Sequence, residues 1–228
     1  MIDIHTHVLP FVDDGSESLS KSLEMVKTAS ENGITDLFLT PHHSERTKTP
    51  KEIIEVFNKF KKEVENLNIP INLYLGNEIF YETNTIERIK ENKCLTMNGG
   101  KFVLIEFSTY HPIDVEEASY KLIRAGYVPI IAHVERYSYL TPENYHELKN
   151  MGALLQINAE AIVGKLKRKR QNAVKYLFKH ELVDFVSSDV HSDRPNLMQE
   201  AFRAVQKKYG EFAAQVVFNL KAKEIIKG

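Results

Sequence analysis

The sequence has little of several features that mark common protein classes. Cys94 is the only cysteine among 228 residues, so an internal disulfide and a thiolate zinc site are both excluded. The chain has no apolar run of about 18 residues and does not start with a lysine-rich then apolar segment, so neither a membrane span nor a signal peptide is indicated. The formal net charge of −1 gives no sign of a nucleic-acid or membrane surface. We therefore expect a protein of the reducing cytoplasm, without membrane insertion and without a nucleic-acid partner.

Three familiar catalytic motifs are also missing. Cysteine-dependent phosphatases need an arginine six positions after the nucleophile, and the residue six positions after Cys94 is Gly100. The sequence contains no Gly-x-Ser-x-Gly elbow and no Gly-x4-Gly-Lys-[Ser/Thr] phosphate loop. Any enzymatic chemistry must rest on other residues.

Short apolar runs alternate along the chain with amphipathic segments of helical spacing. The apolar runs predict seven strands, at residues 2–4, 36–39, 71–75, 102–105, 128–132, 154–157 and 183–186. The amphipathic segments predict helices at residues 18–31, 50–66, 113–125, 142–151, 171–180 and 197–209. Such alternation predicts an α/β fold with a parallel sheet, and the length suits a single domain over residues 1–228. Periodicity leaves an open doubly wound sheet and a closed barrel equally acceptable.

Polar residues follow the predicted strands at their carboxyl ends, where α/β enzymes place their active sites. Six of the seven strands end in a histidine or a carboxylate. In chain order these strand-end residues are His5, His7, Asp13 and Asp14, then His42 and His43, Glu78, Glu106, His133 with Arg136, Asn158, and Asp189 with His191. Taken singly, many have a structural explanation, such as a turn at Asp13-Asp14-Gly15. Their joint placement predicts one shared site, to which His42 rather than its neighbour His43 contributes because adjacent side chains diverge.

Imidazole and carboxylate ligands without a thiolate suit zinc, manganese and iron, and the many carboxylates favour the harder ions. One ion accepts about four to six ligands, so eight or nine predict two or three ions with a carboxylate between them. Clustered metals suit the hydrolysis of phosphate esters, because a metal lowers the pKa of its bound water toward ~7 and so makes hydroxide the nucleophile.

The segments that carry these residues resemble a known superfamily. They read "MIDIHTHVLPFVDDGSES", "TPHH", "GNEIF", "IAHVERY" and "SSDVHSDRP". The pattern is similar to that of the polymerase-and-histidinol-phosphatase (PHP) superfamily, and within it to the bacterial protein-tyrosine phosphatases encoded beside capsule and exopolysaccharide genes. This resemblance implies a distorted seven-stranded (β/α) barrel and a manganese-dependent enzyme with two or three ions, for which iron, cobalt, zinc or magnesium are substitutes. It also implies a partner, the tyrosine-rich tail of a bacterial tyrosine kinase that controls polysaccharide synthesis.

The resemblance also implies roles for individual residues. Nine would be metal ligands: His5, His7, Asp14, His42, Glu78, Glu106, His133, Asp189 and His191. Glu78 would bridge two metals, and Asp14, His42 and His191 would hold a third. Arg136 and Arg194 would be catalytic residues that bind phosphoryl oxygens through the guanidinium fork.

Two other functions fit the same residues. One is a histidinol-phosphatase-like enzyme that acts on a small molecule, although 228 residues is short for that. The other is a non-catalytic metal-binding scaffold, which such a full set of ligands disfavours. The basic run at residues 165–170 is either a solvated face or a docking site for an acidic segment.

Overall fold

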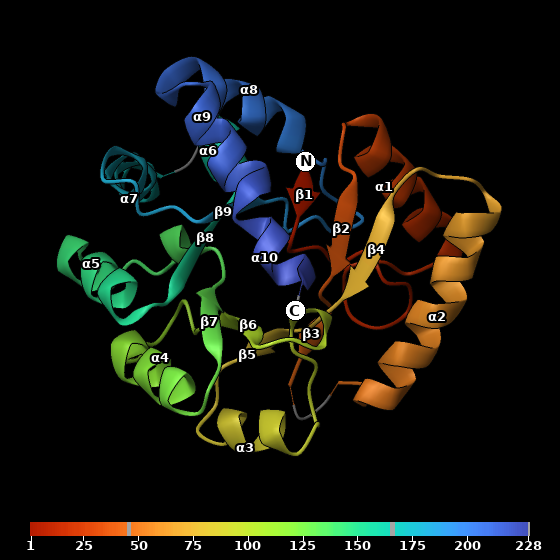
Figure 1. The fold of residues 1–228 in the computed structure, drawn as a ribbon, viewed down its shortest axis with the longest axis horizontal. Coiled ribbons are helices and arrows are strands. Elements are labelled where there is room, and N and C mark those ends of the chain that lie inside the picture. The colour runs from red at the N-terminus through yellow and green to blue at the C-terminus, as the bar shows by residue number, and fades with distance from the viewer. Residues whose placement is uncertain (45–46, 165–166, 228) are drawn as a thin grey trace.

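In the part of the chain that the structure describes, nine short strands form the curved wall at the centre of the molecule (Figure 1). The computed structural model describes residues 1–44, 47–164 and 167–227. In chain order the strands are β1 (Ile2–Asp3), β2 (Asp36–Leu39), β3 (His42–His43), β4 (Asn72–Leu75), β5 (Glu78–Phe80), β6 (Phe102–Glu106), β7 (Val128–Ile131), β8 (Leu154–Asn158) and β9 (Phe185–Ser187).

All neighbouring strands pair in parallel, in a three-stranded part with the order β1-β2-β4 and a six-stranded part with the order β3-β5-β6-β7-β8-β9. Strands β3 and β5 follow β2 and β4 after two residues each, so each pair acts as one bent strand. The first and last strands meet through a parallel bridge between Thr6 and Val190. The His7 N–H donates to the Val190 carbonyl at 3.0 Å beside that bridge. The wall is therefore a distorted seven-strand barrel, as the family resemblance implies.

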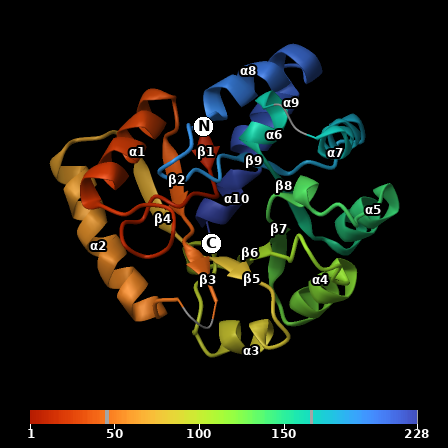
Figure 2. The same ribbon diagram turned by 180° about the vertical axis from the view of Figure 1, so that it is seen from behind.

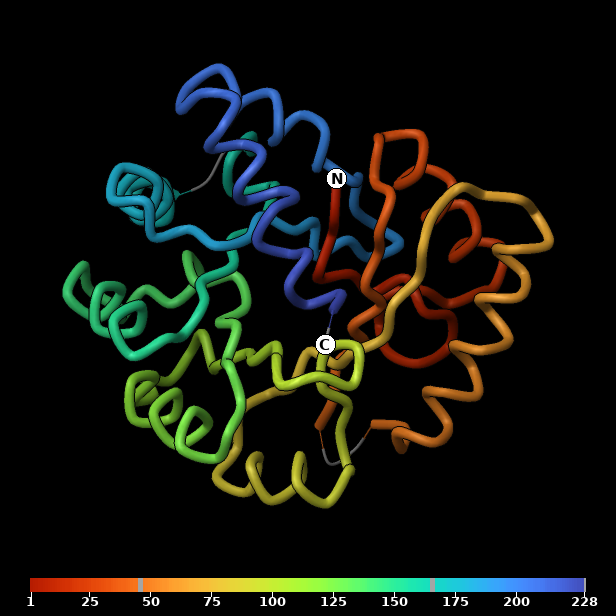
Figure 3. The backbone as a smooth tube through the Cα atoms, viewed as in Figure 1, coloured from red at the N-terminus to blue at the C-terminus, as the bar shows by residue number. Residues whose placement is uncertain are grey.

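Helices surround this wall in chain order, so the colour in Figure 3 runs once around the molecule. The long ones are α1 (Leu19–Glu31), α2 (Pro50–Asn66), α4 (Val115–Arg124), α5 (Pro142–Met151), α7 (Arg168–Lys179) and α8 (Met198–Tyr209). The short ones are α3 (Thr85–Lys90), η1 (Met97–Gly99), η2 (Val134–Arg136), α6 (Ala159–Val163), α9 (Glu211–Gln215), the π-helical η3 (Val216–Leu220) and α10 (Ala222–Lys227). No helix in the described ranges combines the length and the hydropathy that a bilayer crossing requires.

Local sequence explains where several helices begin. Thr49 caps α2 through a reciprocal capping box with Glu52, and Pro50 occupies the first turn, where its missing N–H costs nothing. Thr141 caps α5 in the same way, with Asn144 as the reciprocal partner. Such caps fix the helix starts on the side of the barrel where the strands end.

The apolar core has two parts. The larger lies between the strands and the surrounding helices. The smaller fills the barrel interior, where Ile2, Phe38, Leu104 and Phe185 pack with Ile225 of α10. Figure 1 shows α10 across the middle of the barrel, and Asn98 donates to the Ile226 carbonyl at 3.0 Å. The last helix therefore closes the amino end of the barrel and leaves the carboxyl end for polar groups.

The sequence-based elements agree with the structure to within a few residues, with some additions. Strands β3 and β5, helices α3, α6, α9 and α10 and the short helical turns were not predicted. The basic run at 165–170 lies partly outside the described residues, since residues 165 and 166 are not described, and its end forms the first turn of α7.

Candidate metal centre

Glu78 occupies the centre of a polar cluster at the carboxyl end of the barrel. It is fully buried, and it stands directly opposite His42 in the parallel register of β5 and β3. Its Oε2 lies 3.2 Å from the Nε2 atoms of both His5 and His7 and 2.9 Å from Nδ1 of His42. Its Oε1 lies 2.9 Å from Nε2 of His133. The two oxygens of one carboxylate thus face different histidines.

Asp189 faces the same histidine pair from the other end of the chain. Its Oδ1 lies 3.5 Å from Nε2 of His5 and 3.4 Å from Nε2 of His7. Glu106, at the end of β6, extends the cluster on the far side of Glu78, with 3.5 Å between its Oε1 and Nε2 of His133.

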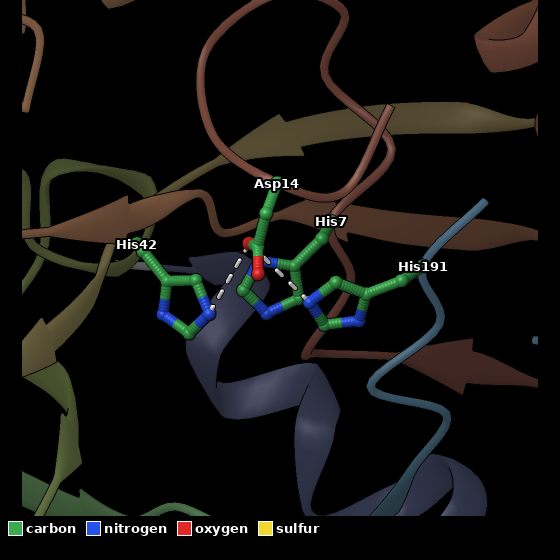
Figure 4. A group of neighbouring side chains, drawn as sticks. All are labelled: His7, Asp14, His42 and His191. Atoms are coloured by element: carbon green, nitrogen blue, oxygen red, sulfur yellow. Dashed lines mark ion pairs between the residues drawn. The ribbon is translucent and has the colours of Figure 1, made fainter. Parts of the chain in front are cut away.

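A third part of the cluster forms around Asp14, in the loop after β1 (Figure 4). The Asp14 carboxylate points between two rings, with Oδ1 at 3.7 Å from Nε2 of both His42 and His191. The His191 ring stacks on His7 at 4.1 Å between centroids. Figure 2 shows the molecule from behind the view of Figure 1, which is the side on which the strands end in loops.

The structure therefore brings together all nine residues for which the sequence predicts metal binding. Three subsets present one ligand atom each within 4.8 Å of one another: His7, Asp14, His42 and His191; His5, His7 and Asp189; and His42, Glu78 and Glu106.

The electrostatics of the cluster favour cations. Burial acts to raise the pKa of Glu78, yet the positive charge of His5 and the contacts with His133 and His42 hold that pKa well below its usual range. Burial acts to lower the pKa of His133, but Glu106 and Glu78 outweigh it and raise the pKa to about 9. Carboxylates thus stay charged and hold protons on nearby imidazoles, which are the protons that a divalent cation displaces when it binds.

Glu78 supplies a direct test of whether these residues fit a metal. Its Oε2 is buried and, among the described residues, makes no contact of hydrogen-bond geometry, although three ring nitrogens approach within 3.2 Å. A buried carboxylate oxygen without a partner is costly. The donor set and this unpartnered oxygen fit divalent ions held between the carboxylate and the rings.

Two candidate ligands adopt strained backbone conformations. His133 has φ of 32° and Asp189 has φ of 50°, in the left-handed region that non-glycine residues rarely adopt. Each such residue costs about 1–3 kcal/mol and persists only where its surroundings enforce it. Both stand where a strand ends, so the turn aims their side chains into the cluster.

Asp13 has a role that the sequence did not reveal. Its Oδ2 accepts from Nδ1 of His7 at 2.7 Å and from the backbone N–H of His42 at 2.9 Å. Burial acts to raise the pKa of Asp13, but the hydrogen bond and charge of His7 dominate and lower it to about 2. Asp13 therefore orients His7, while its neighbour Asp14 reaches the opposite side of the cluster. The two adjacent acidic residues were the only sign of this role in the sequence, because the direction in which each side chain points depends on the conformation of the loop.

The two arginines both approach Asp189. Nη2 of Arg136 donates to its Oδ2 at 2.7 Å, and Nη1 of Arg194 lies 3.8 Å from the same oxygen. Arg136 thus pairs with Asp189. His43 is buried and turned away, with its Nδ1 3.1 Å from the Thr47 hydroxyl.

Comparison with known proteins supports the same reading of the chain. The family described as "Capsular polysaccharide synthesis, CpsB/CapC" matches residues 1–227. The chain is 33% identical over 240 aligned positions to the tyrosine-protein phosphatase CpsB of Streptococcus agalactiae serotype V, covering 100% of this chain and 98% of that one. The chain belongs to the CpsB/CapC family.

Other CpsB/CapC relatives extend the comparison to structure. The tyrosine-protein phosphatase YwqE of Bacillus subtilis is 31% identical over 217 positions, which cover 92% of this chain and 85% of YwqE. A crystal structure from a study of B. subtilis YwqE and Streptococcus pneumoniae CpsB, described as unique metal-dependent tyrosine phosphatases, matches with a TM-score of 0.86 at 31% identity, over 94% of this chain and 90% of that one. Histidinol phosphate phosphatase from Lactococcus lactis, at 16% identity and a TM-score of 0.57 over 91% of this chain and 94% of that one, shares the fold alone. The PHP-type barrel predicted from the sequence is thereby confirmed.

Proposed function

We propose that this protein is a manganese-dependent protein-tyrosine phosphatase that acts on the phosphorylated, tyrosine-rich tail of a bacterial tyrosine kinase. The observation that carries the proposal is the gathering of nine histidine and carboxylate side chains in one cluster, with the buried carboxylate of Glu78 at its centre. Family membership and the phosphatase names of the relatives supply the reaction class.

The ligands support a particular number and type of ion. His7 belongs to two of the three subsets, and His42 also belongs to two. This overlap supports one connected centre of two or three ions that share ligands. Ligands rich in carboxylate and free of sulfur suit manganese, and the imidazoles favour it over magnesium. Bound divalent ions would lower the pKa of a coordinated water and neutralise charge on the phosphoryl group.

The chain's own residues then have distinct tasks. The histidines and carboxylates would hold the ions, and Asp13 would keep the His7 ring in place. Arg136 and Arg194, with 25% and 42% of their side chains exposed, are accessible enough to bind phosphoryl oxygens. A guanidinium can hold two such oxygens at once through its fork.

The macromolecular partner and the compartment belong to the proposal as well. The cluster lies at the open loop end of the barrel, which suits a phosphotyrosine presented on a flexible segment. A cytoplasmic location is in keeping with the lone, buried Cys94.

The test is hydrolysis by protein stripped of metal and then supplied with one ion at a time. We expect Mn²⁺ to restore turnover of a phosphotyrosine peptide, and to do so better than Mg²⁺. Histidinol phosphate, assayed in parallel, should be a poor substrate. Preferred hydrolysis of histidinol phosphate would identify a small-molecule phosphatase, and metal binding without hydrolysis of either compound would identify a scaffold.

A further inference from the structure

Strand β8 contributes no candidate metal ligand, yet it sends two buried polar side chains toward the cluster. Gln156 and Asn158 are 0% and 2% exposed. Alternation along the strand places them on the same face as Leu154, which packs in the barrel interior, while Leu155 and Ile157 face the outer core. Buried amides on an interior face are costly unless they are hydrogen-bonded.

These amides form one continuous chain of hydrogen bonds between candidate ligands. Oε1 of Gln156 accepts from the backbone N–H of His133 at 2.8 Å and lies 3.1 Å from Nδ1 of His5. Nε2 of Gln156 donates to Oδ1 of Asn158 at 2.9 Å. Nδ2 of Asn158 donates to Oδ2 of Asp189 at 2.7 Å.

The chemistry of the two ends fixes the direction of the whole chain. A backbone N–H can only donate, so the Gln156 atom that faces His133 must be the oxygen. An ionised carboxylate can only accept, so the Asn158 atom that faces Asp189 must be the nitrogen. Neither amide can be flipped without opposing two donors or two acceptors at one end.

This direction determines which nitrogen of His5 carries a proton. Because the Gln156 oxygen can only accept, Nδ1 of His5 must donate. In the neutral ring this leaves the lone pair on Nε2, the atom that lies 3.2 Å from Glu78 and 3.5 Å from Asp189. The same oxygen also holds the backbone of His133 in its left-handed conformation at φ 32°.

We propose that Gln156 is a positioning residue for the metal centre. It selects the metal-binding tautomer of His5, supports the strained turn at His133 and, through Asn158, fixes the orientation of Asp189. The inference rests on the proposed function, because it assigns a role in the same metal centre. Partners that orient metal ligands in this way typically contribute about 10–100-fold to metal affinity or activity.

The experiment compares Gln156→Leu with Gln156→Glu. Leucine is similar in size and removes the acceptor, whereas glutamate keeps an acceptor oxygen for His5 and His133, replaces the donor to Asn158 by a second oxygen and adds a negative charge. We expect Q156L to bind Mn²⁺ about 10–100-fold more weakly than the wild type, measured by competition with a chelating dye. Q156E should recover a large part of that loss, which a role in packing alone would not predict.

A matched control separates this role from general destabilisation. Ile225→Ala removes core contacts at the opposite end of the barrel, and its folded form should bind Mn²⁺ as the wild type does. Wild-type affinity in folded Q156L, or equal affinities for Q156L and Q156E, would overturn the proposal. Should Q156L not fold, Asn158→Ala decides in the same assay, since it removes the side-chain bonds to Asp189 and to Gln156 and should weaken Mn²⁺ binding several-fold. Unchanged Mn²⁺ binding by Asn158→Ala would overturn the proposal. A wild-type protein that binds no Mn²⁺ would instead refute the proposed function.

Discussion

At the scale of single residues, Arg136 is placed to act on the phosphoryl group. It adjoins the cluster through Asp189 and keeps a quarter of its side chain exposed. We predict that Arg136→Ala lowers kcat on a phosphotyrosine peptide by roughly 10²–10³, as the loss of other preorganised donors does. Arg136→Lys should recover turnover only in part, because an ammonium lacks the planar fork. Arg124→Ala, on the exposed side of α4, is the control, and an R136A protein with normal kcat/KM would exclude the role.

Glu78 makes a separate prediction about metal content. Its two carboxylate oxygens face different histidines, which fits a residue shared between ions. Glu78→Gln keeps the size but replaces an oxygen by a donor, so we expect the loss of more than one Mn²⁺ per chain in metal analysis of the purified protein. Loss of a single ion, with the others still tightly bound, would contradict a bridging role.

The thiol of Cys94 should be unreactive at neutral pH and should take no part in turnover. The side chain is buried, and burial raises the pKa of the thiol to about 11, against the opposing effect of Arg88. The thiol is thus protonated at neutral pH, and only the thiolate is a nucleophile. We predict slow alkylation by iodoacetamide at pH 7.5, a rate that rises as the pH approaches 11, and turnover within a few-fold of wild type for Cys94→Ser. Rapid alkylation of the folded protein at pH 7.5 would show that the thiol is reactive.

At the scale of secondary structure, α10 closes the amino end of the barrel. Ile225 is fully buried among interior residues of several strands, so Ile225→Ala leaves a cavity there. We expect the free energy of unfolding to fall by about 2–5 kcal/mol in urea titrations. Lys223→Ala, on the exposed side of the same helix, should change it by no more than about 0.5 kcal/mol. Equal stabilities of the two variants would mean that α10 does not seal the barrel.

The secondary structure and the site could be predicted from the sequence only in part. Apolar runs such as 102–105 reveal a strand because a strand buried on both faces must be apolar. Strands β3 and β5 were not predicted because they are two and three residues long and consist partly of the polar residues His42, His43 and Glu78. The carboxyl-end rule predicted that the strand-end residues would meet at one site, since it depends only on topology, and the resemblance implied which nine of them bind metal. The bonds of Asp13 and Gln156 depend on loop conformation and rotamers, which periodicity does not encode.

At the scale of the whole molecule, the cluster ties the chain's two ends together. His5 and His7 follow the first strand and Asp189 follows the last, and the barrel closes between them through a single bridge beside these residues. A cation held there would link both sides of the seam. Because the unfolded chain does not bring these ligands together, metal binding should stabilise the folded state.

This coupling predicts a metal-dependent melting temperature. At a free Mn²⁺ concentration of about 100 times the dissociation constant, one site adds about 2.7 kcal/mol, and each kcal/mol corresponds to roughly 2–4 °C for a chain of about this size. We expect Mn²⁺ to raise Tm by roughly 5–11 °C over chelator-treated protein in differential scanning calorimetry. Glu78→Gln should lose most of this shift, whereas Lys223→Ala should retain it, since that exposed side chain lies at the far end of the barrel. Equal Tm values for wild type with and without Mn²⁺ would mean that the folded chain binds Mn²⁺ no more tightly than the unfolded chain does, which would contradict a metal centre formed by folding.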